Sequence, residues 1–168
     1  MNQNVNDPVQ DLDRLLEIAA YDLYSDDVRS LLDDIARRGA ELFGLPLAAV
    51  TIVLEGAQYF AGSHGLGGWL REAEGTPIEW SFCANTVRRR DSYIVTDATT
   101  DELQHANPVV TEDGVRCYAG APLVAPNGQI LGAFCVIGTE QREFSESERE
   151  TLRDLAAEVM SELERFRI

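Results

Sequence analysis

The sequence of 168 residues predicts an α+β domain with three layers, in which a sheet lies between helices and loops. Two apolar runs flank Asn127-Gly128, a dipeptide that accepts the positive φ angles of a tight turn, which predicts a β-hairpin over residues 114–138. These runs are apolar at nearly every position, so both faces of the hairpin are expected to be covered. Amphipathic helical patterns near both ends of the chain supply part of that cover.

Composition excludes several classes of partner. The formal net charge is −15 and every one of the 14 basic residues is arginine, so the chain is repelled by nucleic acid and by anionic lipid. The longest apolar runs are too short to cross a membrane. The first residues are polar and acidic rather than a secretory signal, and three cysteines without CxxC spacing fit a reducing compartment. We therefore expect a cytoplasmic protein that binds neither nucleic acid nor membrane.

The N-terminal part is predicted to begin with a disordered lead-in over residues 1–10, followed by a single domain over residues 11–168. A helix is expected from Asp11, and Ser25 before two aspartates is a typical N-cap for a second helix that ends at Gly44. The first of these helices carries an apolar stripe at spacings of 4, 3 and 4, made of Leu12, Leu16, Ala19 and Leu23.

The remaining elements follow from apolar runs and their punctuation. In chain order they are a strand over 46–54, a strand over 58–63, a glycine-rich loop over 62–68, a short helix over 81–90, a strand over 93–96 and a long connection over 98–113. Ser145 and Glu148 form a capping box for a terminal helix, whose stripe is Leu152, Ala156, Val159, Leu163 and Phe166. Both terminal stripes favour a homodimer through these helices, and the alternative is packing on the domain's own sheet.

The hairpin also places the cysteines. A two-residue loop at Asn127-Gly128 pairs Val124 with Leu131 and Gly120 with Cys135. Because successive side chains alternate between the faces of a strand, Cys117 then lies on the opposite face from Cys135. We therefore expect no bond between these two cysteines.

The order of elements, together with several motifs, resembles a GAF domain over about residues 25–167. The motifs are SFC at 81–83, IVTDA at 94–98, Asn107-Pro108, VRCYAGAPL at 115–123 and LGAFCVI at 131–137. The resemblance implies a GAF-like α/β/α fold, with a central antiparallel sheet, terminal helices on one face and pocket loops on the other. It also implies signalling to a kinase, cyclase or phosphodiesterase, and we expect here either a free-standing sensor or a partner on a separate chain. Close relatives often carry histidine where this chain has Asn85.

Nine residues are candidates for binding an unidentified small molecule, and none is predicted to be catalytic or to bind a metal. Large aromatic side chains suit a flat apolar ligand, and a few polar groups would anchor it. Each candidate also has a structural alternative, such as core packing for the aromatics or a turn for Asp97. The set is Phe60, His64, Trp69, Trp80, Phe82, Cys83, Asp97, Asn107 and Tyr118.

The cofactor is unknown, and the sequence supports neither haem nor bilin. Bilin-binding relatives carry a Cys-His pair before the hairpin, which this chain lacks, and both of its histidines fall in polar or glycine-rich loops. We expect a non-catalytic sensor of a small molecule or of redox state. Two alternatives stay open: a thiol enzyme using Cys83 that resembles free methionine sulfoxide reductases, which the lack of a cysteine before the hairpin disfavours, and a ligand-free dimerisation module.

Overall fold

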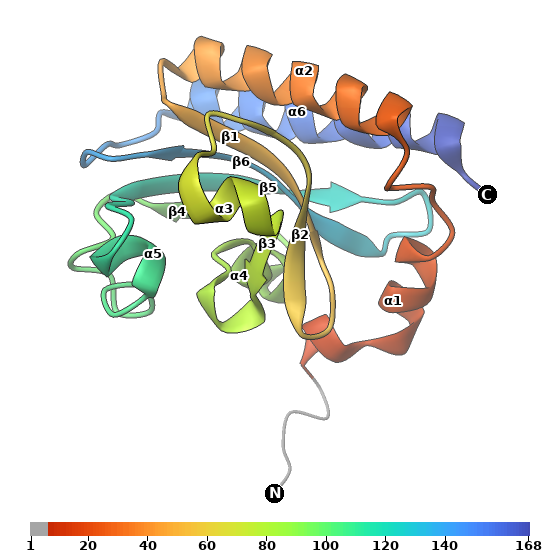
Figure 1. The fold of residues 1–168 in the computed structure, drawn as a ribbon, viewed down its shortest axis with the longest axis horizontal. Helices are drawn as coiled ribbons and strands as arrows, with labels where there is room; N and C mark the ends of the chain where they lie inside the picture. The colour runs from red at the N-terminus through yellow and green to blue at the C-terminus, as the bar shows by residue number, and fades with distance from the viewer. Residues whose placement is uncertain (1–6) are drawn as a thin grey trace, which may run out of the picture.

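The computed structural model describes residues 7–168, which form an antiparallel sheet between two layers (Figure 1). Within these residues the strand order across the sheet is β3-β2-β1-β6-β5-β4. The strands are β1 Leu47–Val53, β2 Ala57–His64, β3 Gly75–Pro77, β4 Tyr93–Val95, β5 Cys117–Val124 and β6 Ile130–Gly138. The helices are α1 Leu12–Ile18, α2 Asp26–Phe43, α3 Gly68–Ala73, α4 Cys83–Arg89, α5 Pro108–Thr111 and α6 Glu146–Leu163, with 3-10 turns at Pro8–Gln10, Ile78–Trp80 and Glu164–Phe166.

The two long helices α2 and α6 run side by side over one face of the sheet, and α3, α4 and α5 lie on the other (Figure 1). Their ends follow the predicted caps. Ser25 Oγ accepts the N–H of Val28 at the start of α2, and Gly44 ends that helix in the left-handed conformation at φ 64°. At the start of α6, Ser145 and Glu148 form the reciprocal capping box. The predicted α+β architecture is therefore confirmed. None of the helices described is both long and apolar enough to cross a membrane.

The first helix differs from its prediction. α1 ends at Ile18, and Leu12 and Leu16 of the predicted stripe are 66% and 59% exposed. The helix stops because the backbone beyond it pairs with the end of the chain: the Asp22 N–H donates to Phe166 O, and the Ile168 N–H donates to the carbonyl of residue 20. α1 therefore lies at the end of the sheet, and the neighbour of α6 is α2. The stripe of α6 is buried in the domain's own core.

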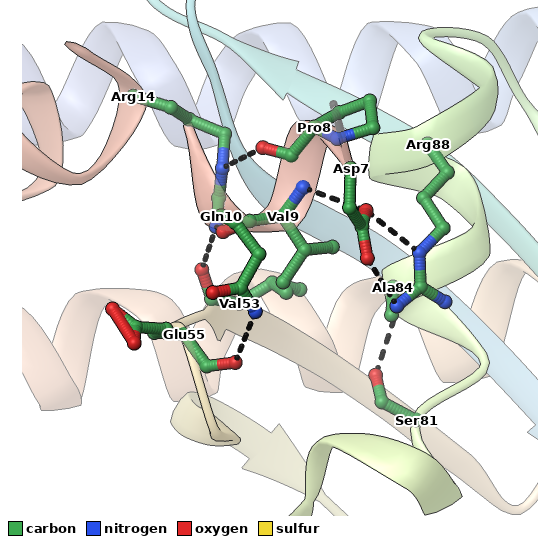
Figure 2. Close-up of polar contacts among 10 residues, drawn as sticks. All are labelled: Asp7, Pro8, Val9, Gln10, Arg14, Val53, Glu55, Ser81, Ala84 and Arg88. Atoms are coloured by element: carbon green, nitrogen blue, oxygen red, sulfur yellow. Dashed lines mark hydrogen bonds and ion pairs between the residues drawn. The ribbon is translucent and has the colours of Figure 1, made fainter. Parts of the chain in front are cut away.

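The prediction of disorder over residues 1–10 is wrong for its last part. Residues 1–6 lie outside the described chain, but Pro8–Gln10 form a 3-10 turn and Val9 is fully buried. The buried guanidinium of Arg14 donates to the carbonyls of Val9 at 2.9 Å and Val53 at 2.7 Å, which binds this segment to the end of β1 (Figure 2). A hydrophobic side chain and an arginine thus order a segment whose composition is otherwise polar.

The hairpin has the predicted pairing up to Leu123, including Gly120 opposite Cys135. Its turn is longer than predicted, because Val124 pairs with Ile130 rather than Leu131 and the Ala125 N–H donates to Gln129 O. The extra residue in β6 is a β-bulge, which turns Leu131 toward the face of α2 and α6. The predicted separation of Cys117 from Cys135 is confirmed, since the two belong to core clusters on opposite faces of the sheet.

Candidate functional site

A mostly apolar cavity of about 50 Å³ lies on the face of the sheet opposite α2 and α6. Strands β1, β2, β5 and β6 supply its floor, and α3, α4 and the loops before the hairpin supply its walls. Five of the nine predicted residues line it, namely Phe60, Trp80, Phe82, Cys83 and Tyr118. Four of the predicted aromatic residues and the predicted cysteine therefore lie together at one cavity, and their role in binding a ligand stays a prediction.

Tyr118 organises the inner wall of this cavity. Its ring lies back over Gly120, where an added Cβ would come within 2.1 Å of the tyrosine oxygen. From this position the Tyr118 hydroxyl donates to Cys83 Sγ at 3.0 Å and lies 3.1 Å from Thr86 Oγ1. The rings of Phe82 and Tyr118 pack at a centroid distance of 5.1 Å. Glycine at 120 is thus required for the tyrosine to reach the thiol.

The pKa values of the two thiols on this face, Cys83 and Cys135, are shifted in opposite directions. Burial raises the pKa of the Cys83 thiol, but hydrogen bonds from Cys135, Thr51 and Tyr118 outweigh it and lower the pKa below its ordinary value. The pKa of the Cys135 thiol is raised well above its ordinary value, because its hydrogen bond to Cys83 retains its proton and because it is buried. Burial also raises the pKa of Tyr118, and the neighbouring thiols add to this effect. Cys83 is therefore the more acidic of the pair.

Four predicted residues do not line the cavity. Trp69 covers it from outside, packing edge-on against Trp80 at 5.7 Å while its indole N–H donates to Asp113. His64 is exposed at the end of β2, in a neighbouring polar groove. Asp97 closes a turn by accepting the N–H and the hydroxyl of Thr99.

Asn107 is buried but plays a structural part. Its side chain caps α5 by accepting the Val109 N–H, and its amide donates to Trp80 O at 3.2 Å and to Gln104 Oε1 at 2.9 Å. It therefore holds the backbone behind the cavity in place without contacting the cavity itself.

Several residues that line the cavity were not among the nine candidates predicted from the sequence. Cys135 lines the cavity and was predicted to pair with Gly120, but it was not among the nine candidates for ligand binding. Leu66 of the glycine-rich loop and Leu70 of α3 also line the cavity. Val109 joins them from α5. Residues 7–168 contain no cluster of metal-binding side chains.

A polar groove of about 390 Å³ adjoins the cavity and shares Phe60, Leu66 and Leu70 with it. Arg29 of α2 crosses this groove. Its guanidinium donates to Tyr59 Oη at 2.8 Å and to Phe60 O at 3.1 Å, and it lies 3.3 Å from the carboxylate of Glu74. The Phe60 N–H in turn donates to Glu74 O. These contacts connect the end of α3, strand β2 and α2.

Comparison with known proteins agrees with this architecture. The sequence pattern of the GAF domain family matches residues 27–163. A cyclic di-GMP phosphodiesterase of Pseudomonas aeruginosa is 33% identical over 139 residues, which are 82% of this chain and 23% of that protein. The chain therefore spans less than a quarter of that relative's length.

Solved structures show the same fold. The GAF domain from a phosphoenolpyruvate-protein phosphotransferase of Coxiella burnetii has a TM-score of 0.70 at 17% identity, covering 97% of this chain and 96% of that one. A type II free methionine-R-sulfoxide reductase from Thermoplasma acidophilum has a TM-score of 0.68 at 14% identity, covering 88% and 99%. At these identities the likeness concerns the fold alone.

Proposed function

The chain belongs to the GAF domain family, whose members are generally regulatory, and we propose that it is a non-catalytic sensory domain that binds a small apolar molecule. The observation that carries the proposal is the apolar cavity under α3, where five predicted aromatic and thiol residues meet. We assign the domain to the cytoplasm as part of the same proposal, because its three cysteines are free thiols.

The size of the cavity requires that its cover move. Typical pockets for drug-sized ligands have volumes of about 300–1,000 Å³, several times more than this one. The helix α3 is suited to move for two reasons. None of its residues Gly68–Ala73 is buried, and its N-cap residue Gly67 has no side chain to make a capping hydrogen bond. We propose that a ligand displaces Leu66 and Leu70 and lifts α3.

The contacts of Arg29 supply a route from this cover to the opposite face. Because Arg29 of α2 pairs with Glu74 at the end of α3 and also binds the carbonyl of Phe60 in β2, a displacement of α3 acts on α2 directly. We propose that ligand binding shifts the population between two positions of α3 and so alters the packing of α2.

The output is proposed from the curated relative. Since a cyclic di-GMP phosphodiesterase contains a similar segment, we propose that this domain reports to a phosphodiesterase or kinase, on the same or a separate chain. We also propose a homodimer. The stripe of α6 is already buried in the domain's own core. The exposed apolar side chains Leu12 and Leu16 of α1 are therefore proposed to form the dimer contact.

The experiment compares two neighbouring valines of α5. Val109 lines the cavity, whereas Val110 is equally buried in the same cluster and does not. Native mass spectrometry of protein purified from its own host is expected to reveal a small-molecule adduct on the wild type and on Val110→Phe, and none on Val109→Phe, which fills the cavity. Hydrogen exchange in α2 is expected to change when the adduct is removed from the wild type.

Two results would contradict the proposal. One is an adduct that Val109→Phe and Val110→Phe retain equally, since the molecule would then bind elsewhere. The other is turnover of free methionine sulfoxide with a thiol reductant, which would make the domain an enzyme.

A further inference from the structure

We propose that Cys83 and Cys135 form an oxidisable pair, in which a small peroxide entering the cavity converts the two thiols into a disulfide. This assigns to the cavity a redox modification site that does not depend on the small molecule proposed above. Three independent features support it: the strand register, the shared cavity and the hydrogen-bond chain to Cys83.

The strand register and the Tyr118 side chain place Cys83 and Cys135 on the same side of Gly120. Cys135 faces Gly120 across the hairpin, and facing residues have Cβ positions about 4.5–5.5 Å apart. The Tyr118 ring occupies the space above Gly120, with its oxygen 2.1 Å from where a Cβ would be. Cys83 Sγ lies 3.0 Å from that oxygen. Cys83 and Cys135 therefore both lie beside the Tyr118 ring above Gly120 and line one cavity, and each influences the pKa of the other.

The hydrogen bonds assign different roles to the two sulfurs. With the Tyr118 hydroxyl donating to Cys83, the Thr86 hydroxyl is free to donate to the tyrosine oxygen, so donors point in sequence toward Cys83 Sγ. This arrangement stabilises negative charge on Cys83, which is the form of cysteine that attacks peroxides. Cys135 keeps its proton and is placed to react second.

Access to the pair comes from the cavity. Cys83 and Cys135 are 2% and 1% exposed to bulk solvent, but both line the cavity of about 50 Å³. A cavity needs about 10–15 Å³ of such volume to hold one water molecule, so hydrogen peroxide, about two waters in size, can enter. Cys117 is buried to the same degree on the opposite face and does not line the cavity. It is an internal control for oxidation that follows unfolding.

The reaction balances with peroxide as the oxidant. The Cys83 thiolate attacks one peroxide oxygen, an S–O bond forms, the O–O bond breaks, and hydroxide leaves with its electron pair and takes up the proton that Cys83 gave up. The resulting sulfenic acid is attacked by the sulfur of Cys135. The S–S bond forms, the S–O bond breaks, and the departing hydroxyl takes the Cys135 proton to leave as water. Two thiols are oxidised and one peroxide is reduced to two waters.

The test exposes the folded wild-type chain to hydrogen peroxide, blocks the remaining thiols and maps peptides without reduction. We expect a Cys83–Cys135 disulfide while Cys117 stays a thiol. In Cys135→Ala the reaction stops at the sulfenic acid, so dimedone is expected to label Cys83. In Tyr118→Phe the oxidation rate of Cys83 is expected to fall about tenfold, the effect of losing one hydrogen bond to a charged sulfur. Cys117→Ala is expected to form the disulfide at the wild-type rate.

Three outcomes would overturn the proposal: oxidation of Cys117 at the rate of Cys83, a disulfide that includes Cys117, or Cys83 and Cys135 that both stay thiols while the peroxide is in excess. Because the first measurement uses the wild-type chain, it does not depend on whether a variant folds. Failure to form the disulfide would leave the small-molecule adduct of Val109 and Val110 variants unaffected, so the two proposals fail separately.

Discussion

Replacing Arg14 with methionine is expected to destabilise the domain although it removes a buried charge. Arg14 is 2% exposed, and the hydrogen bonds found for its guanidinium within residues 7–168 all end on backbone carbonyl oxygens. The three shortest of them reach Val53 at 2.7 Å, Val9 at 2.9 Å and Ile130 at 3.1 Å. They connect the N-terminal segment to the end of β1 (Figure 2) and to the start of β6.

The magnitude follows from two opposing effects. Hydrogen bonds to charged groups contribute about 1.5–3 kcal/mol each, so these three contribute about 5–9 kcal/mol to the free energy of unfolding. Burial lowers the pKa of Arg14 from its ordinary value to about 10, and this shift corresponds to a cost of about 3 kcal/mol for keeping the charge inside. Methionine keeps much of the packing of the arginine stem and loses both effects. The expected net loss is about 2–6 kcal/mol, out of a typical total of about 5–15 kcal/mol.

Urea unfolding followed by circular dichroism measures this loss. With a slope of about 2 kcal/mol per molar urea, the midpoint of Arg14→Met should fall by about 1–3 M. Arg88 supplies the matched control, because it binds the same segment through Asp7 but is largely exposed (Figure 2). Arg88→Met should cost about 0–1 kcal/mol. A loss below about 1 kcal/mol for Arg14→Met would show that water satisfies the carbonyls and would refute the reasoning.

Three further outcomes are expected. The pKa of Glu17 is lowered chiefly by its hydrogen bond from Arg167, so Glu17→Gln should cost about 1–3 kcal/mol near neutral pH. A carboxylate with a lowered pKa stabilises the fold above its ordinary pKa of 4.5. In urea unfolding, the difference in stability between the wild type and Glu17→Gln should therefore shrink as the pH falls below that value. Ser145→Ala removes the capping box shared with Glu148 and should cost about 1 kcal/mol in thermal unfolding, whereas Ser145→Thr should cost less. Leu16→Glu should change stability by less than about 0.5 kcal/mol, and if α1 forms the proposed dimer contact it should shift sedimentation toward the monomer.

The helix caps could be predicted from the sequence because their chemistry is local. Ser25 and Ser145 each bind a backbone N–H three residues away, so no knowledge of distant residues is needed. The end of α1 could not be predicted, because it is fixed by pairing with residues 166–168, almost 150 positions away. The apolar pattern past Ile18 correctly predicted that Leu23 is buried, but it wrongly predicted that the helix continues to that residue.

The hairpin shows the same limit on a shorter scale. Alternation placed the cysteines on the correct faces, since this needs only the period of a strand. The bulge at Leu131 inserts an extra residue that no local sequence pattern predicts. It places the Leu131 side chain on the face of α2 and α6 instead of the face of Cys135. Among the candidate site residues, Phe60 and Tyr118 line the cavity, whereas His64, at the end of β2, lies beside it in a groove.

The two faces of the sheet differ in what covers them, and under the proposed function this difference determines which face accepts a ligand. On one side the two long helices α2 and α6 pack on the strands, whose buried side chains include Phe134 and Leu123. On the opposite side, strand positions such as Gly120 and Ala133 are small. The strands there also carry large side chains such as Tyr118 and Phe60, and side chains from connecting segments, including Leu66 and Leu70, complete the wall of the cavity. Connecting segments can move at lower cost than paired strands, because they break fewer backbone hydrogen bonds when they do so. Under the proposed function, the size of the accepted ligand is therefore set by how far residues 65–74 move, while the sheet fixes the shape of the floor.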